Sequence, residues 1–206
     1  MKVIVFGAAG ATGKLIVDEC LARGYDVTAF VRDATKLVTR DGVRVVEGDM
    51  LNANAVAAAI VGHDAAIHAV GSGNMKASTV RTETARILVA AMQQAGVKRL
   101  VAMSGMGAGE SRDGMPAVVR AVIVPLLLGR LLRDQNGLEH HVTSSSLDWT
   151  LVRPGELKDV EKTGNIKASL DYKGVSMGVP RPDVAAFIVD QLASDVYLRK
   201  APALGT

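Results

Sequence analysis

A glycine-rich turn directly follows an apolar, β-branched segment near the start of the chain. The segment Lys2–Phe6 has the composition of a buried strand, and the sequence GAAGATG at residues 7–13 comes next. A helical pattern over Thr12–Arg23 then begins inside that turn. A strand, a glycine turn and a helix in immediate succession are typical of the phosphate-binding corner of a βαβ unit. This order restricts the chain to a fold built on parallel strands.

Each glycine of the turn has a separate physical task. Gly7 permits the tight turn, Gly10 lets the backbone approach a pyrophosphate, and Gly13 lets the helix pack closely on the sheet. The amino end of the helix offers free N–H groups and a partial positive charge to phosphate oxygens. The turn therefore predicts a dinucleotide site, with contacts from Gly7, Ala9, Gly10, Ala11, Thr12 and Gly13.

The remaining chain continues the alternation of strands and helices. Strands are expected over Asp26–Val31, Val43–Glu47, Asp64–Ala69, Lys98–Met103 and Asp148–Val152, and helices over Asn52–Val61, Ala77–Gln94, Gln135–Ser145 and Asp183–Leu192. Gly24, Gly62 and Gly96 fall where helices should end in left-handed caps. The pattern predicts an α/β fold, a single-domain Rossmann-like doubly wound parallel sheet over residues 1–206, with strand order 3-2-1-4-5-6.

Composition supports this fold and narrows the partners. Only 3% of the residues are aromatic against 49% hydrophobic, so the core must consist of Val, Ala, Leu and Ile. The net charge of +3 comes from interspersed charges, which argues against nucleic acid, and no uninterrupted apolar run suits a membrane. The sequence holds no metal-ligand motif and one cysteine, Cys20, so we expect no metal and a reducing, cytoplasmic location. We expect a monomer or a weak homodimer.

Two insertions interrupt the alternation, around residues 105–135 and 156–180. Met115–Leu132 resembles an apolar helix broken near Pro125, and Val160–Pro180 suits short strands or a flap. Both leave from the carboxyl ends of strands, where ligands of doubly wound folds bind. We expect them to form the substrate side of the site; the alternative is that they are surface loops.

The end of the second expected strand indicates which nicotinamide cofactor binds. An acidic residue there would accept the ribose hydroxyls of NAD, whereas an arginine accommodates the 2′-phosphate of NADP. Arg32 holds this position and Lys36 lies one helical turn onward. Asp33 adjoins Arg32 and could face the ribose instead, so NAD(H) stays the less favoured alternative to NADP(H).

The spacing G-x-x-G-x-x-G resembles that of the short-chain dehydrogenase/reductase superfamily, in its extended and atypical branches. Further landmarks follow in the same order: Val31-Arg32-Asp33, Gly48-Asp49-Met50, Val70-Gly71 and Leu151-Val152-Arg153-Pro154-Gly155. Among atypical members the chain is most similar to flavin and biliverdin reductases and to NmrA-like NADPH-binding proteins. That similarity spans nearly the full length, is dense in FGAAGATG, VVEGDM, GVKRLVAMSG and RPDVAAFIVDQL, and weakens over 106–137 and 156–179.

The resemblance implies roles for residues beyond the glycine turn. It implies that Asp49 contacts the adenine amine and that Met50 packs on the ring, although Asp49 could also be a turn residue. Along the rest of the cofactor it implies contacts from Val70, Gly71, Met103, Ser104, Pro154 and Gly155, with the last two flanking the nicotinamide. The chain departs from the reductases near Gly73, where they carry an arginine beside the cofactor.

The chain lacks the Tyr-x-x-x-Lys pair of the better-known superfamily enzymes. Its tyrosines are Tyr25, Tyr172 and Tyr197, and none has a lysine four residues on. Leu131 and Gln135 occupy the positions where the resemblance would place the pair. No general acid of the usual kind is therefore present.

Two other residues are candidates for acid–base chemistry. Ser104 is the remaining catalytic candidate, with a turn hydroxyl as the alternative, and Gly105 replaces a serine that similar reductases often carry next. His68 lies inside a strand, which favours a buried neutral histidine over a catalyst.

Together these features predict an NADPH-dependent oxidoreductase that transfers a hydride to a small planar acceptor such as a flavin, a biliverdin-like tetrapyrrole or a quinone. Solvent would supply the proton, and the protein would supply proximity and exclusion of water. A non-catalytic NADP(H)-sensing regulator of the NmrA type is the first alternative. A sugar-nucleotide epimerase or dehydratase is the second.

Overall fold

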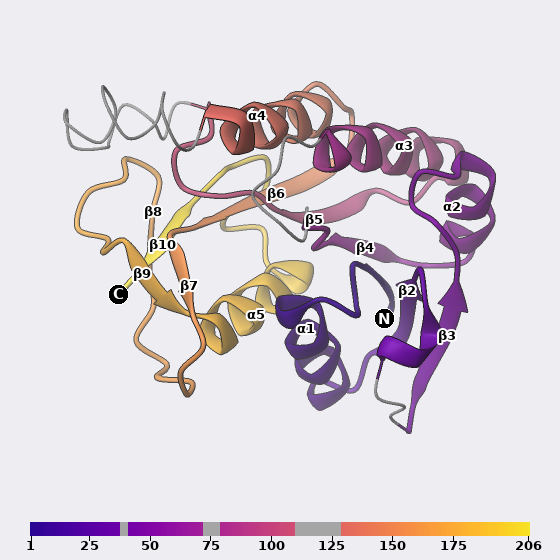
Figure 1. Cartoon of the computed structure of the whole chain (residues 1–206), viewed down its shortest axis with the longest axis horizontal. Coiled ribbons are helices and arrows are strands. Elements are labelled where there is room, and N and C mark those ends of the chain that lie inside the picture. Colours follow the sequence, from indigo (N-terminus) through magenta and orange to yellow (C-terminus); the bar gives the residue numbers. More distant parts are fainter. Residues whose placement is uncertain (38–40, 72–78, 110–128) are drawn as a thin grey trace.

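The computed structural model describes residues 1–37, 41–71, 79–109 and 129–206. Its main sheet has eight strands in the order β3-β2-β1-β4-β5-β6-β10-β8 (Figure 1). The first six in space are parallel: β3 (Val43–Glu47), β2 (Asp26–Val31), β1 (Lys2–Phe6), β4 (Ala65–His68), β5 (Arg99–Met103) and β6 (Asp148–Pro154). Beyond them, β10 (Ala203–Gly205) runs parallel to β6, and β8 (Lys167–Ser169) is antiparallel to β10. The predicted strand order is confirmed.

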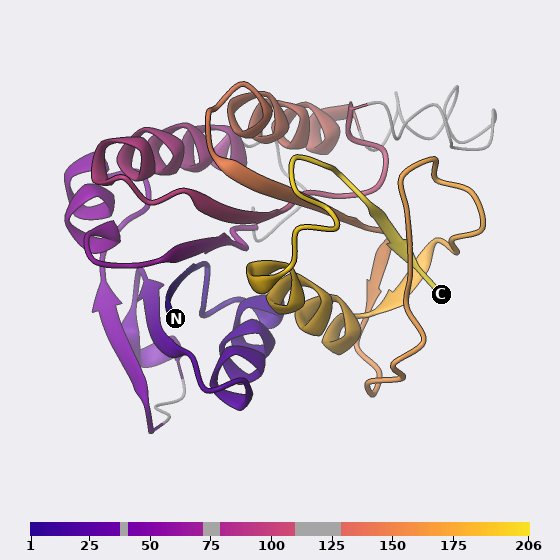
Figure 2. The ribbon, with the colours of Figure 1, turned by 180° about the vertical axis from the view of Figure 1, so that it is seen from behind.

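Helices cover both faces of this sheet, so the architecture is the doubly wound, Rossmann-like α/β fold. One face carries α1 (Ala11–Ala22) and α5 (Arg181–Asp190), and the other carries α2 (Ala53–Ile60), α3 (Val80–Ala95) and α4 (Gly129–Thr143) (Figures 1 and 2). Two buried clusters correspond to these faces. Alternate residues of β1 divide between them, because successive side chains of a strand point to opposite faces.

The structure corrects several of the expected helix boundaries. The helix expected to begin at Gln135 starts six residues earlier, at Gly129, and the closing helix spans Arg181–Asp190 and continues as a short 3-10 helix, η4 (Gln191–Ala193). Helix α3 begins at Val80 rather than at the expected Ala77. Gly24, Gly62 and Gly96 have φ values of +70°, +79° and +73°, the left-handed geometry expected of residues that follow helices.

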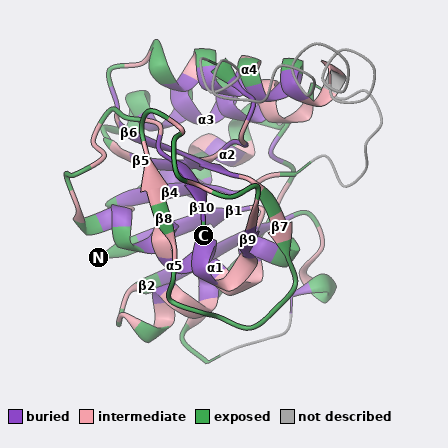
Figure 3. Cartoon of the chain, turned by 90° about the vertical axis from the view of Figure 1, so that its left-hand side faces the viewer, coloured by how far each residue is buried: buried purple, intermediate pink, exposed green. Residues whose placement is uncertain are grey.

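Short strands or a flap were the two structures expected for the second insertion, and it forms short strands. A small parallel sheet pairs β7 (Glu156–Lys158) with β9 (Gly178–Pro180), while β8 joins the main sheet. Figure 3 views the molecule from the side of the second insertion. The loops of the insertion are exposed, and the strands of the main sheet behind them are buried. The expected Met115–Leu132 helix falls mostly outside the described residues, as does Gly73.

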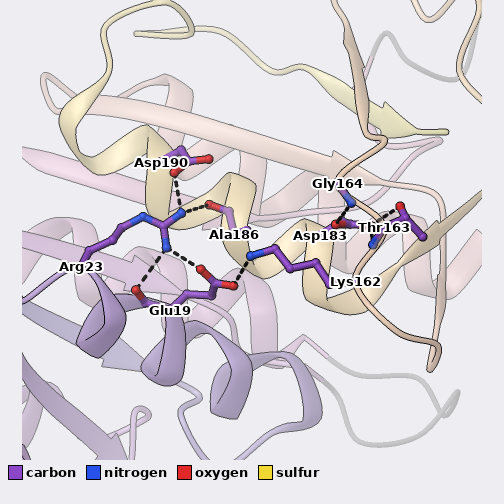
Figure 4. Close-up of polar contacts among 8 residues, drawn as sticks. All are labelled: Glu19, Arg23, Lys162, Thr163, Gly164, Asp183, Ala186 and Asp190. Atoms are coloured by element: carbon purple, nitrogen blue, oxygen red, sulfur yellow. Dashed lines mark hydrogen bonds and ion pairs between the residues drawn. The ribbon is translucent and has the colours of Figure 1, made fainter.

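The loop between β7 and β8 is fastened to the α1 and α5 face (Figure 4). Lys162 forms an ion pair with Glu19 of α1, and the buried Asp183 carboxylate accepts hydrogen bonds from the Thr163 and Gly164 backbone N–H groups. Arg23 adds a link between the helices by pairing with Glu19 and with Asp190 of α5. These contacts hold the insertion against the carboxyl half of α1 and the amino end of α5. Within the described ranges, no helix combines the length and apolarity needed to cross a membrane.

Candidate functional site

A cavity of about 930 Å³ opens at the carboxyl ends of the central parallel strands. Twelve of the sixteen residues predicted to contact a cofactor line it: Gly7, Ala9, Gly10, Ala11, Thr12, Arg32, Lys36, Asp49, Met50, Val70, Gly71 and Met103. The other four, Gly13, Ser104, Pro154 and Gly155, do not line it. The structure thus brings together residues spread over the first half of the chain.

The glycine turn forms the floor of this cavity. Gly7 has φ +86°, and a Cβ on it would lie 2.6 Å from the Ala69 carbonyl oxygen of the neighbouring strand. The Gly10 N–H donates to the Gly7 carbonyl at 3.0 Å and closes the turn. A Cβ on Gly13 would lie 2.1 Å from the same carbonyl oxygen, so Gly13 supports the turn from beneath. Gly13 does not line the cavity because it packs beneath the turn.

Helix α1 begins at the turn with its first N–H groups available to a ligand. Gly10 is the N-cap residue, no side chain caps the helix, and no acidic residue lies in the first turn. Such an end attracts anions through its N–H groups and its partial positive charge. The Thr12 hydroxyl lies at this end and accepts a hydrogen bond from Arg181 at 3.0 Å.

The end of β2 places two cations on the cavity wall. Arg32 and Lys36 are both exposed and both line the cavity. Asp33 also lines it, but its carboxylate accepts hydrogen bonds from the Thr35 N–H and hydroxyl at 3.0 and 2.6 Å. The hydrogen bonds to Thr35 hold the pKa of Asp33 below its usual value. Because Oδ1 accepts both of these bonds and Oδ2 lies 3.4 Å from the Lys36 ammonium, both oxygens of Asp33 have partners nearby in the chain, and Arg32 is the better placed of the two to meet a ligand.

Asp49 and Met50 line the cavity where β3 ends. The Asp49 Oδ1 accepts the Leu51 N–H at 2.9 Å, which is the turn role considered for it from sequence. A carboxylate has a second oxygen, so this turn bond does not use up the acceptor capacity of Asp49. Met50 is buried, with 6% of its surface exposed, and gives the cavity an apolar wall.

At the opposite end, Val70, Gly71 and Met103 line the cavity together with Arg81 and Thr84 of α3. Sequence reasoning missed both α3 residues. The site that a Cβ would occupy on Gly71 lies 3.9 Å from an Arg81 guanidinium nitrogen. The chain therefore brings a guanidinium to this end of the cavity from α3, and this guanidinium lies 3.4 Å from the Asp134 carboxylate.

His68 lies behind this end of the cavity as a buried, neutral side chain. Its Nε2 is 2.9 Å from the Thr84 hydroxyl, which in turn donates to the Val80 carbonyl. Burial lowers the pKa of His68 to about 4. A histidine of this kind orders Thr84 and does not serve as a proton donor near neutral pH.

The remaining predicted residues have other surroundings. Ser104 is buried, with 7% of its surface exposed, and its hydroxyl has no hydrogen-bond partner among the described residues. Pro154 is buried at the end of β6. A Cβ on Gly155 would lie 2.1 Å from the Met177 carbonyl oxygen, so Gly155 permits the close approach of the chain before β9. The proposed contacts of these residues with a nicotinamide stay predictions.

The surroundings of Gln135 account for the glycine at position 105. Gln135 is buried on α4, and a Cβ on Gly105 would lie 2.4 Å from its side-chain nitrogen. The glutamine thus fills the space that a serine at position 105 would need. All three tyrosines are described, and none lines the cavity.

A second cavity, of about 440 Å³, lies between α4 and the strands beyond β5. Arg153 and Glu139 line it as a buried ion pair, with Nε–Oε1 and Nη2–Oε2 distances of 2.9 and 2.7 Å. Their side chains are only 2% and 6% exposed. Arg153 also donates a hydrogen bond to the hydroxyl of Tyr172, the tyrosine of the second insertion. Within the described residues, no group of three or more His, Cys, Asp or Glu side chains could hold a metal ion.

Comparison with known proteins places these features in a family. A family model described as NAD(P)H-binding matches residues 7–195. An uncharacterized protein, YwnB of Bacillus subtilis, is 32% identical over 203 residues, which cover 93% of this chain and 92% of YwnB.

Solved structures agree with the fold. The oxidoreductase ylbE of Lactococcus lactis superposes with a TM-score of 0.88 over all of this chain and 91% of that one, at 24% identity. ChuY, an anaerobillin reductase of Escherichia coli O157:H7, superposes with a TM-score of 0.81 at 26% identity, over all of this chain and 97% of its own.

Proposed function

The chain belongs to the NAD(P)H-binding family, and from that premise we propose that it is an NADPH-dependent reductase of a small planar acceptor. The observation that carries the proposal is the cavity: a glycine turn and an uncapped helix end at one side, and the ends of β4 and β5 at the other. The residues fit a dinucleotide, since the uncapped end of α1, with no acidic residue in its first turn, offers N–H groups to phosphate oxygens, and the exposed Arg32 lines the same cavity.

The residues of the cavity divide by the part of the cofactor that each would hold. The glycine turn, Thr12 and the first N–H groups of α1 would hold the pyrophosphate. Asp49 and Met50 would hold the adenine, and Val70, Gly71 and Met103 would hold the nicotinamide half. Ser104, Pro154 and Gly155 belong to the proposed nicotinamide surroundings, with Ser104 as the hydroxyl that orients the ring.

We propose NADPH over NADH because of the end of β2. Arg32 and Lys36 add two positive charges to the cavity wall, where a 2′-phosphate would lie. The Asp33 carboxylate, which would favour the ribose hydroxyls of NADH, is occupied by Thr35 and by Lys36 at 3.4 Å.

The reaction would need little acid–base chemistry from the protein. When bound, NADPH supplies a hydride from C4 of its nicotinamide. Met103 and Leu157 would offer an apolar surface against which a planar acceptor lies and from which water is excluded. No tyrosine lines the cavity and His68 is buried and neutral, so solvent would supply the proton. The similarity to ChuY, an anaerobillin reductase, supports a tetrapyrrole as one acceptor of this planar class.

The test is consumption of NADPH in the presence of FMN, biliverdin or a quinone. We expect turnover on at least one acceptor, faster with NADPH than with NADH. The matched control is the Gly13→Ala variant, which should lose turnover with all three because the turn that holds the cofactor is displaced. Tight NADPH binding with no turnover on any acceptor would overturn the proposal.

One observation favours a second candidate, a non-catalytic NADP(H) sensor of the NmrA type. Ser104, the sole catalytic candidate from sequence, does not line the cavity. A sensor needs the cofactor site without a proton donor, and the acceptor panel separates the two functions. An epimerase or dehydratase ranks below both, because it requires the acid–base pair that Leu131 and Gln135 replace.

The proposal includes a cytoplasmic, monomeric or weakly dimeric protein. Cys20 is the sole cysteine, and burial raises the pKa of its thiol to about 12. A thiol of this kind is inert and does not require an oxidising compartment.

A further inference from the structure

Arg181, the first residue of α5, lies at the phosphate end of the cavity although nearly 170 residues separate it from the glycine turn. Its guanidinium donates to the Thr12 hydroxyl at 3.0 Å and lines the cavity. Only 16% of the side chain is exposed. The packing of α5 beside α1 on one face of the sheet brings the two residues together (Figure 1).

The surroundings of this guanidinium suit a doubly charged anion. The α1 end has neither a side-chain cap nor an acidic residue in its first turn. An arginine beside such an end adds a full positive charge and a fork of donors that matches phosphate oxygens. Arg32 and Lys36 line the cavity from the end of β2 instead, where they would meet a different part of a dinucleotide.

In the structure the guanidinium is paired with Asp159 of the second insertion. The Nε–Oδ1 and Nη2–Oδ2 distances are 2.6 and 3.3 Å, and the Asp159 side chain is 77% exposed. Hydrogen bonding to Arg181 lowers the pKa of Asp159. Because the Asp159 carboxylate faces solvent, water and salt screen its attraction to Arg181 and weaken the pair. A ligand with two negative charges at the helix end can therefore compete with this one carboxylate.

The loop that carries Asp159 is held by other contacts. Lys162 pairs with Glu19, and Thr163 and Gly164 donate to the Asp183 carboxylate (Figure 4). These contacts do not involve Arg181, so the loop keeps its attachment to α1 and α5 when the guanidinium changes partner.

We propose that Arg181 is a ligand of the cofactor's pyrophosphate and that Asp159 is the counter-ion it exchanges for that pyrophosphate. The inference rests on the proposed cofactor site and assigns it a residue from the far end of the chain. Asp159 belongs to the second insertion, so filling the cofactor site would release a carboxylate beside the acceptor if that insertion forms the substrate side as we propose.

The test uses ADP-ribose, which has the pyrophosphate but neither the nicotinamide nor the 2′-phosphate, alongside NADPH and NADH. Calorimetry on Arg181→Gln should show affinity for all three reduced by a similar factor of about ten. Arg181→Lys, which keeps the charge but not the fork, should fall between that variant and the wild type. Arg32→Ala should weaken NADPH alone. Arg86→Gln, which removes an arginine paired with Glu83 on the exposed side of α3, is the charge-matched control and should change none of them.

Asp159→Asn should change the affinity for ADP-ribose in the opposite direction. Removing the competing carboxylate should tighten ADP-ribose about threefold, and the gain should vanish in the Arg181→Gln background. The proposal is overturned if Arg181→Gln leaves ADP-ribose affinity unchanged, or if Asp159→Asn weakens it. Either result with NADPH turnover intact would leave the proposed function standing, whereas a wild type that binds no nucleotide would overturn both.

Discussion

Arg181 of the larger cavity and Arg153 of the smaller cavity are paired in opposite ways. In the larger cavity Arg32 is exposed, and Arg181 is paired with a carboxylate that is itself 77% exposed. In the smaller one Arg153 is 2% exposed and is matched by both oxygens of Glu139. An arginine whose partner is exposed can exchange that partner for a ligand, whereas a buried ion pair is a fixed part of the folded structure. The Arg181 pair is therefore one that an anion can displace, as we propose, whereas the Arg153 pair stabilises the fold.

The largest effect is expected from Glu139→Gln. It would remove the carboxylate that forms a buried ion pair with Arg153, and breaking a buried pair in this way destabilises a protein by about 3–5 kcal/mol. Asp159→Asn makes the same chemical change in the exposed pair and should leave the urea unfolding midpoint nearly unchanged. Similar midpoints for the two variants would contradict the contrast between the cavities.

The second-largest effect is expected when the pH is lowered, because His68 is buried in its neutral form. The unfolded state protonates His68 near pH 6.5, but burial lowers its folded pKa to about 4, so the unfolded state binds more protons between these values. The free energy of unfolding should therefore fall as the pH drops through this window, by about 3 kcal/mol in total.

His68→Gln isolates this contribution from that of acidic groups such as Asp183, whose lowered pKa acts in the same direction at lower pH. Urea titrations at several pH values should give the variant a shallower dependence between pH 6.5 and 4. Parallel curves for variant and wild type would show that His68 is not the buried neutral group described.

Gly13→Ala tests the support beneath the glycine turn. The added Cβ would lie 2.1 Å from the Gly7 carbonyl oxygen, so the turn must move, at a cost of about 1–3 kcal/mol and with NADPH binding lost. Gly24→Ala is the control: Gly24 has φ +70° and no atom lies within 4 Å of the place where its Cβ would stand, so it should lose about 1 kcal/mol and bind normally. Equal binding by both variants would contradict the assigned role of the turn.

Arg32→Ala carries the smallest expected effect. It should reduce the ratio of NADPH to NADH affinity about tenfold, because one exposed, charge-assisted contact to a 2′-phosphate is removed. Arg44→Ala, at an exposed position on β3, is the matched control. If Arg32→Ala leaves this ratio unchanged, then either Lys36 determines the preference for NADPH or the protein has no such preference.

What could be predicted from sequence was local in the chain. The glycine turn, Arg32 and Asp49 each follow a strand directly, and the parallel strand order then carries them to one edge of the sheet. Arg181 and Arg81 could not be placed this way, because each begins a helix and reaches the cavity only through the packing of that helix beside the central strands. Strand β10 was missed for a similar reason: three residues near the chain end pair only because β6 offers an open edge.

Residues expected at the nicotinamide show the same limit. Pro154 ends β6 and Gly155 follows it, as their motif indicated, yet Gly155 packs against the Met177 carbonyl oxygen and does not line the cavity. That contact comes from the second insertion, where the resemblance to other reductases is weakest. Sequence similarity placed the strand end correctly and could not foresee which segment would pack against it.

The most direct measurement of the central claim is hydride tracing with NADPH deuterated at C4. With a flavin, tetrapyrrole or quinone that supports turnover, we predict a slower rate for one of the two deuterated epimers of NADPH and deuterium in the reduced acceptor wherever that hydrogen does not exchange with solvent. Such a result requires the nicotinamide and the acceptor to meet in a fixed orientation within the cavity. NADPH that binds tightly, shows no isotope effect and delivers no deuterium to any acceptor would contradict the account.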